Sequence, residues 1–298
     1  MTEFLQQLIN GLSLGAIYAL IALGYTMVYG VLRFINFAHS DVFMVGAFSG
    51  FYLARLFPNR SFAMGLAVLF GAMAICATLG VLIEKLAYRP LRGRSTLTVL
   101  ITAIGMSLLL QNTGQLIFGA NPKSFPKLFA QTNFTLPGRV VVSSDQLIVF
   151  AVAIVLLVGL RHIVLHTKIG TAMRAVSFNP VAASLVGISN DRVISFTFAL
   201  GSSLAGAGGI LYALNYPSID PLMGTLPGLK AFVSAVLGGI GNIPGAALGG
   251  MVIGVVETFV AGSARWSTYR DAIAFAVLIL ILLFRPAGLL GKFQVEKV

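Results

Sequence analysis

The chain has 298 residues, of which 57% are hydrophobic and only 10% are charged. A soluble domain carries about 25% charged residues, so this composition cannot cover a water-exposed surface and predicts an integral membrane protein. The net charge of +11 does not indicate binding to nucleic acid, because the basic residues lie in a few connecting loops and no nucleic-acid-binding motif is present. Basic residues in the loops of a helical membrane protein indicate its orientation instead.

Apolar windows of 18 or more residues predict membrane-spanning α-helices, whereas a barrel would show short alternating segments. The sequence therefore predicts an all-α integral membrane protein, a polytopic helical bundle of eight or nine spans with broken, Gly-rich segments. We expect one transmembrane domain over residues 1–298. In chain order the expected spans are residues 8–29, 42–56, 62–83, 97–118, 147–165 and 193–214, a Gly-rich apolar region over 226–259, and a last span over 272–284.

The Gly-rich region 226–259 is too long for one crossing, which takes about 20 residues. The sequence "GGIGNIPGAALGG" interrupts it, and glycine and proline disfavour a continuous helix. We expect two short crossings joined by a tight turn at 242–244, with a re-entrant pair as the alternative. Glycines four residues apart are typical of close helix contacts, although broken backbone can also line a cavity. The residues assigned to these breaks and contacts are Gly238, Gly239, Gly241, Asn242, Pro244, Gly245 and Gly249.

The distribution of Lys and Arg predicts the orientation in the membrane. With nine crossings, 12 basic residues lie on one side and 7 on the other. The positive-inside rule then places the N-terminus outside and the C-terminus in the cytoplasm. Eight crossings would put the C-terminal tail outside. The N-terminal sequence has no basic n-region, so no cleaved signal peptide is expected. The segment 119–146 is predicted to form an external hairpin-like cap.

A polar stretch, "SFNPVAASLVGISNDRVI" at residues 177–194, separates two long apolar segments. Asn179 fits a helix N-cap, Pro180 fits the first helical position, and Gly187 fits a stop signal. The pattern predicts a helix near 178–188 of about two turns, or about 10 Å. So short a helix is marginal in water alone, so it lies on the membrane surface or is supported by a partner.

Small and charged residues in this stretch suggest how a partner could bind. Ala182 and Ala183 are small enough to let a partner surface approach the backbone. Arg174, Asp191 and Arg192 flank the helix with charges that could orient that partner.

Polar side chains within the spans are candidates for a solute pathway, because such groups are costly in lipid and tend to face the bundle interior. Alternative roles are an ordinary tight loop at the membrane surface for the "INFAHSD" residues and bonds to a neighbouring helix for those of "LLLQNTGQ". For Glu257, the alternatives are an interfacial or paired group and a gate. An intramembrane enzyme would need a second catalytic cluster, which the sequence does not show. The pathway candidates are Asn36, His39, Asp41, Gln111, Asn112, Gln115 and Glu257.

The stretch "AASLVGISNDRVISFTF" resembles the cytoplasmic loop of ABC importer permeases, in which three residues separate a pair of alanines from a glycine. In that family the loop usually begins with a Glu, whereas Val181 stands here. Nearly the whole chain is similar to the permeases of branched-chain amino-acid ABC transporters, with one departure: Ser40 follows the His where a Gly is common. The segments that carry this resemblance are residues 12–48, 83–95, 101–112, 185–206 and 228–257.

The resemblance implies the transmembrane subunit of an ATP-driven importer for branched-chain or related hydrophobic amino acids. It implies alternating access, with the helix near 178–188 acting as the coupling helix. The implied partners are a second permease subunit in a heterodimer, two ATP-binding subunits and an extracytoplasmic solute-binding protein. The implied location is the bacterial cytoplasmic (inner) membrane, with lipid but no nucleic acid bound.

The chain lacks a G-x-x-x-x-G-K-[ST] phosphate-binding loop. We therefore expect no cofactor or metal on this chain and no enzymatic activity, with ATP and Mg²⁺ bound by the partner ATPase subunits. The alternatives are a permease of the same family for urea, amides or other amino acids, and a secondary transporter driven by an ion gradient.

Overall fold

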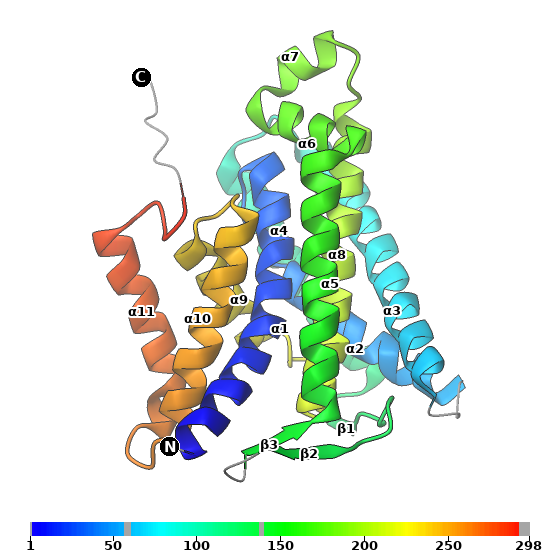
Figure 1. The fold of residues 1–298 in the computed structure, drawn as a ribbon. Helices are drawn as coiled ribbons and strands as arrows, with labels where there is room; N and C mark the ends of the chain where they lie inside the picture. The colour runs from blue at the N-terminus through cyan, green and yellow to red at the C-terminus, as the bar shows by residue number, and fades with distance from the viewer. Residues whose placement is uncertain (1, 57–60, 137–139, 292–298) are drawn as a thin grey trace.

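The computed structural model describes residues 2–56, 61–136 and 140–291 and has the predicted all-α architecture (Figure 1). In the described residues, the only strands are short: β1 (Lys123–Ser124) pairs with β4 (Ser218–Ile219), and β2 (Asn133–Leu136) pairs antiparallel with β3 (Val140–Ser143). The helices are α1 (Thr2–Leu32), α2 (His39–Leu56), α3 (Phe62–Ile83), α4 (Thr96–Phe118), α5 (Ser144–His166), α6 (Lys168–Phe178), α7 (Pro180–Leu185), α8 (Asn190–Asn215), α9 (Thr225–Gly238), α10 (Ile243–Ala261) and α11 (Arg270–Phe284).

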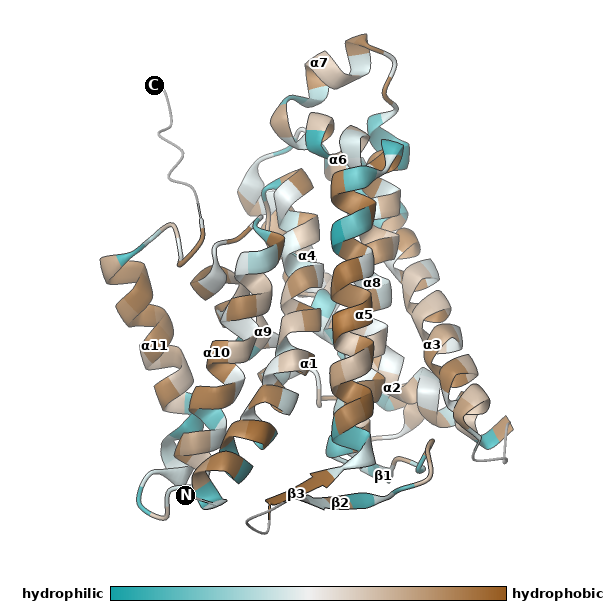
Figure 2. Ribbon diagram, in the orientation of Figure 1, coloured by the Kyte–Doolittle hydropathy of each residue, from teal (hydrophilic) through white to brown (hydrophobic). Residues whose placement is uncertain are grey.

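The bundle has two different ends. Figure 1 shows α6 and α7 at one end, which we call the α7 end, and the strands together with the N-terminus at the other, which we call the hairpin end. Hydrophobic residues cover the middle of α5 and most of α11, whereas polar residues gather at the two ends of α5 (Figure 2). This band of apolar surface is what a bilayer requires of lipid-facing helices.

The helices account for the predicted eight or nine crossings. Seven are long and apolar enough to span a membrane, namely those containing α1, α3, α4, α5, α8, α10 and α11. The two others, α2 and α9, have 18 and 14 residues. Both begin inside the bundle, where Gly224 and Gly228 leave no room for a side chain against Ser40. Two broken helices therefore meet at their first turns.

Helix α1 lies at the centre of the bundle and contacts α8, α9 and α10. Its apolar window is 94% buried, so it is shielded from lipid by other helices. Glycines allow the backbones of α1 and α10 to touch: a Cβ atom on Gly15 would lie 2.7 Å from Cα of Met251. Small residues at such crossings are the usual means of close packing in membranes.

The Gly-rich region divides into two helices, as predicted, but the turn lies earlier than expected. Helix α9 ends at Gly238, and the chain turns through Gly239 and Gly241, which have φ values of +101° and +92°. Glycine adopts this left-handed region without steric cost, which explains why the turn occupies 239–242.

The residues predicted to form the turn instead start helix α10. The side chain of Asn242 accepts a hydrogen bond from the backbone N–H of Gly245 at 3.1 Å and so caps the helix. Pro244 lies in the first helical turn, where a missing N–H costs nothing. Gly245 packs on the backbone of Gly238, and Gly249 packs on that of Ser234, so α9 and α10 lie in close contact.

Candidate functional site: the two polar ends and the core of the bundle

Helix α7 is a six-residue helix, Pro180–Leu185, with a complete N-terminal cap. The side-chain oxygen of Asn179 accepts hydrogen bonds from the backbone N–H groups of Val181 and Ala182, both at 3.0 Å. Gly187, with φ of +85°, reverses the chain after the last turn. Proline, cap and glycine therefore hold the helix together although its length alone would not.

Helix α7 projects beyond the end of the bundle and carries large apolar side chains that contact no other described part of the chain closely enough to be buried (Figure 1). Large exposed apolar side chains gathered on α7 and on the residues next to it, Phe178 and Val186, are typical of a contact site. We call this group the α7 patch, and its members, with their exposed fractions, are Phe178 (89%), Val181 (67%), Leu185 (83%) and Val186 (75%).

The two alanines of the predicted docking surface face opposite ways. Ala182 is exposed, whereas Ala183 is buried in the core, and its carbonyl accepts a hydrogen bond from the N–H of Ile188 at 3.0 Å. Ala183 packs within the chain because a six-residue helix that folds back onto its own chain must bury one face, and its coupling role stays a prediction. Of the two, Ala182 is the one that is exposed to a partner.

The three flanking charges also differ. Arg192 is exposed. Arg174 lies on α6 and donates a hydrogen bond to the carbonyl of Val164, so it holds α6 against α5. Asp191 faces the chain itself and pairs with Arg92. Among these charges, Arg174 and Asp191 serve internal contacts that the sequence did not suggest.

Asp191 belongs to a charged cluster that sequence reasoning missed. Arg89 donates to Glu84 through two nitrogens, each at 3.2 Å, and to Oγ of Ser195 at 2.8 Å. Arg92 pairs with both Glu84 and Asp191. We call these five residues the α7-end cluster. The only available signal was the spacing in "EKLAYRPLR", which places one acid before two arginines.

The α7-end cluster joins two parts of the bundle. Glu84, which is fully buried, begins the π-helical turn Glu84–Tyr88 that follows α3, while Asp191 and Ser195 lie in the first two turns of α8. The amide of Asn190 also donates to the carbonyl of Pro180 at 2.9 Å. Helix α7 is thus tied to the start of α8, and α8 is tied to the end of α3.

Several predicted pathway residues come together at the start of α2. The hydroxyl of Tyr88 donates to Oδ1 of Asn36 at 2.6 Å, and Nε2 of Gln111 donates to Oδ1 of Asp41 at 3.1 Å. Asn36 and Asp41 are buried. The polar segment between α1 and α2 therefore lies within the bundle and not at the membrane surface.

His39 fills the space between α1 and α2. Its ring lies edge-on to that of Tyr25 with 4.7 Å between centroids, and it leaves no room for a side chain on Gly24. Within the described residues, Nε2 of His39 has no hydrogen-bond partner. His39 therefore packs directly against α1.

Two further pathway candidates lie on α4. Asn112 is exposed, and its amide donates to the carbonyl of Leu108 one turn earlier in the same helix. Gln115 is half-buried and follows Gln111 by four residues, so the two lie on one face of the helix. The pathway roles of Asn112 and Gln115 stay predictions.

Glu257 lies near the hairpin end in a buried ion pair. Nζ of Lys230 lies 2.6 Å from Oε1 of Glu257 and 2.6 Å from Oδ1 of Asp271, and the hydroxyl of Tyr18 donates to Oε2 of Glu257 at 2.9 Å. These four residues come from α9, α10, α11 and α1. The network therefore ties four helices together, and Glu257 is a paired group.

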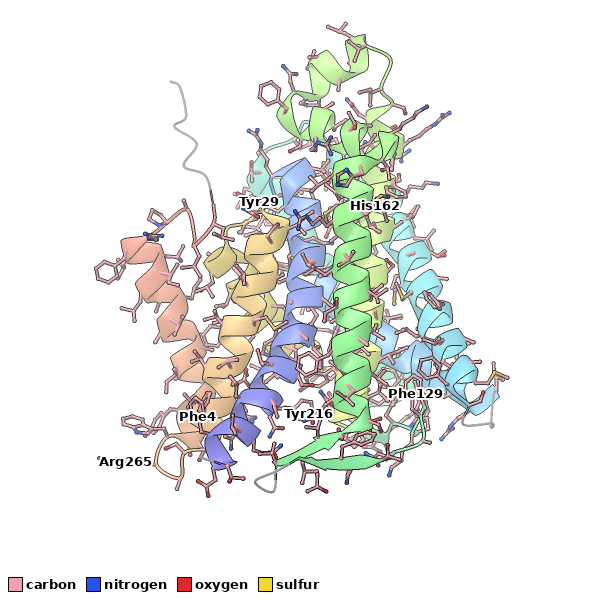
Figure 3. The ribbon with its side chains drawn as sticks, viewed as in Figure 1. Phe4, Tyr29, Phe129, His162, Tyr216 and Arg265 are labelled. Carbon is pink, nitrogen blue, oxygen red and sulfur yellow. The ribbon has the colours of Figure 1, made fainter. Side chains whose placement is uncertain are left out.

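A cavity of about 460 Å³ lies beside this network at the hairpin end. Its walls include Asp145 of α5, Arg270 at the start of α11, Glu257 and Tyr216. Figure 3 shows Tyr216 between the lower parts of α1 and α5. Partial burial raises the pKa of the Tyr216 hydroxyl, and the negative charge of Glu257 adds to this effect, so the hydroxyl stays protonated at neutral pH and can donate a hydrogen bond.

Comparisons with known proteins identify the family of this membrane-spanning helical bundle. The chain matches the family described as "Branched-chain amino acid transport system / permease component" over residues 7–282. It is 43% identical to the high-affinity branched-chain amino acid transport system permease protein BraD of Pseudomonas aeruginosa, over 99% of this chain and 98% of that protein. It is 42% identical to LivH of Salmonella typhimurium, over 99% and 98% of the two chains.

More distant proteins share the fold. A probable branched-chain amino acid transport permease protein LivH from Methanocaldococcus jannaschii is 31% identical over 91% of this chain and 88% of that protein. Among solved structures, a chain of PsaBC from Streptococcus pneumoniae in complex with Fab superposes with a TM-score of 0.51 at 14% identity, covering 95% of this chain and 92% of that one. The chain is a multi-pass membrane protein and belongs to the family of branched-chain amino acid transport system permease components.

Proposed function

We propose that this chain is a transmembrane subunit of an ATP-driven importer that moves branched-chain or related hydrophobic amino acids into the cell. In this proposal α7 is the coupling helix, and partner ATPase subunits bind ATP and Mg²⁺ and push on it. The movement rearranges the spans between states open to either side of the membrane. The chain itself carries out no chemical reaction.

The observation that carries the proposal is the α7 patch. Val181 and Leu185 of α7 and Phe178, the last residue of α6, are more than half exposed at an end of the molecule that extends beyond the apolar band of the bundle. Large apolar side chains in water favour a partner with an apolar groove. Because Asn190 links α7 to α8, force applied to this patch has a direct route into a membrane-spanning helix.

The orientation in the proposal follows from the basic residues. Arg89 and Arg92 lie at the α7 end together with Lys168 and Arg174. By the positive-inside rule the α7 end faces the cytoplasm, so the N-terminus and the hairpin end face outward. The ATPase subunits then meet α7, and the solute-binding protein meets the hairpin end.

The relatives that match over the full chain are named for branched-chain amino acids, which supports this class of solute. A second, different permease is expected to complete the pore as a heterodimer. Urea, short amides and other amino acids remain the alternative solutes. An ion-driven transporter would need free carboxylates deep in the spans. Glu257 is paired with Lys230, whereas Oδ2 of Asp41 has no hydrogen-bond partner among the described residues, so uptake with an ion gradient in place of ATP decides between the two drives.

The test is to express the chain with its neighbouring genes and to purify the assembly through a tag on this chain. We expect an ATPase and a second permease to co-purify, and reconstituted vesicles to take up leucine only with ATP and the binding protein. Uptake that an ion gradient drives without ATP would refute the proposal.

Substitutions test the role of the α7 patch. Leu185→Glu places a charge in the exposed patch, and we expect it to reduce ATP-dependent uptake at least tenfold and to weaken recovery of the ATPase. The matched control is Leu185→Met, which keeps an apolar side chain at the same exposed position and should leave uptake and ATPase recovery unchanged. Normal uptake by Leu185→Glu would remove α7 as the coupling helix.

A further inference from the structure

The cavity at the hairpin end has the size and composition of a small-molecule site. Its volume of about 460 Å³ falls within the range of about 300–1,000 Å³ that is usual for such sites. Residues of α1, α5, α8 and α10 form its walls, so rigid helices position the lining groups.

Two opposite charges in the walls have room for a ligand. Asp145 is buried, and its Oδ2 accepts one hydrogen bond, from Nε2 of Gln131 at 3.0 Å. Arg270 is exposed, and its nearest acidic partner, Asp271, lies 3.8 Å away. Glu257 also lines the cavity, but Lys230 and Tyr18 already occupy both of its oxygens. Asp145 and Arg270 are therefore the charges best placed to bind a further group.

Neutral groups in the walls suit the rest of such a ligand. The amides of Asn10 and Asn215 and the hydroxyl of Tyr216 can donate or accept hydrogen bonds. Leu14 and Leu214 provide apolar surface in the same cavity. A cavity with one acid that forms no ion pair among the described residues, one base, several amides and a few apolar carbons matches the head group and the first side-chain carbons of an amino acid.

We propose that this cavity receives the zwitterionic head group of the transported amino acid on the outer face, with its ammonium at Asp145 and its carboxylate near Arg270. The inference rests on the proposed function and deepens it by naming a receiving site in this subunit. A site with one charge-assisted contact at each end binds weakly enough to release its ligand into the pathway.

The test uses one introduced cysteine in the assembled complex. Ala261→Cys places a thiol in the cavity wall, while the native Cys76 is fully buried and does not react. A membrane-impermeant thiol reagent is applied with and without leucine, and modification of this chain is followed by mass. The matched control is Ala264→Cys, three residues later in the loop that follows α10 and outside the lining of the cavity. Thr258→Cys serves as a second probe should the first assemble poorly.

We expect leucine to slow modification of Ala261→Cys and to leave Ala264→Cys unaffected. Isopentylamine, which lacks the carboxylate, and 4-methylpentanoate, which lacks the ammonium, should each protect less. Asp145→Asn should raise the leucine concentration needed for protection on the order of tenfold, because it removes a charge-assisted contact. Glu3→Gln, a change at an exposed acid outside the lining, should not.

Equal protection by leucine and 4-methylpentanoate would refute recognition of the ammonium group. Protection by the purified solute-binding protein, with no effect of leucine, would assign the cavity to protein docking and overturn the proposal. Leucine uptake by the same preparations separates the receiving site from the proposed function. Uptake without protection of the thiol refutes only the receiving site. A wild-type complex that takes up no leucine refutes the proposed function.

Discussion

The buried network around Lys230 makes the sharpest prediction about stability. Lys230 is 4% exposed and bridges Glu257 of α10 and Asp271 of α11, and Tyr18 of α1 completes the shell. Lys230→Met keeps a similar apolar length and removes only the charge. Glu257 then remains buried as an anion with the Tyr18 hydroxyl as its main partner.

The cost follows from that unpaired charge. Removing one partner of a buried ion pair costs about 3–5 kcal/mol, because the remaining charge keeps its desolvation penalty. Both side chains are buried among the helices, Lys230 at 4% and Glu257 at 6% exposure, where water cannot easily replace the lost contact. A loss of this size lowers the folding equilibrium constant by about a hundredfold or more. Replacing both partners, as in Lys230→Met with Glu257→Gln, should recover most of it.

The assay is thermal unfolding of the purified complex, followed by the loss of its monodisperse peak in size-exclusion chromatography. We expect Lys230→Met to unfold at a clearly lower temperature than the wild type, and the double variant to lie between them or close to the wild type. The difference between single and double variants measures the coupling of the two side chains. If Lys230→Met unfolded at the same temperature as the wild type, the network would have no structural role.

Three further predictions concern the packing of the bundle and the α7 end. Gly254→Ala forces a methyl group toward α1, where it would lie 2.8 Å from the carbonyl oxygen of Gly11. This overpacking should lower the free energy of unfolding by about 1–3 kcal/mol. Gly105→Ala is the control, because no atom lies within 4 Å of the added methyl group, and it should change little. Asn242→Ala removes the cap of α10 and should cost about 0.5–2 kcal/mol, read from the same unfolding curves; no change would mean that water replaces the cap. Glu84→Gln removes the charge shared by two arginines, so we expect normal assembly but lower leucine uptake per ATP hydrolysed, and an unchanged ratio would contradict a linking role.

Hydropathy predicted the fold well because long apolar segments have few alternatives in a membrane. The span expected at 62–83 coincides with α3, and the break in the Gly-rich region is present. The turn was placed three residues late because Pro244 was taken as a breaker. Proline is tolerated in the first turn of a helix, and the two left-handed glycines had already reversed the chain.

The candidate site was only partly predictable because many of its contacts join distant parts of the chain. Ser195 and Glu84 are separated by 111 positions, so no local pattern indicates that they touch. The inward face of α7 was also beyond a sequence argument, since six residues are too few to define a hydrophobic period. That is why Ala183 was assigned to a partner although it packs against its own chain. Only the capping residues, which act locally, were identified with their contacts.

Helix α8 connects the two ends of the bundle and therefore links the two proposals. It has 26 residues, which makes it about 39 Å long, and it runs from Asn190 beside α7 to Asn215 in the wall of the cavity. A rigid helix that tilts when α7 is pushed must move its far end as well. If ATPase closure changes the affinity of the cavity for leucine by some factor, leucine must change the affinity of the ATPase subunits for ATP by the same factor, because linkage is reciprocal. Measuring the protection of Ala261→Cys by leucine with and without a non-hydrolysable ATP analogue gives one side of this equality, and analogue binding with and without leucine gives the other. A factor of one in both measurements would mean that α8 does not couple the α7 end to the cavity.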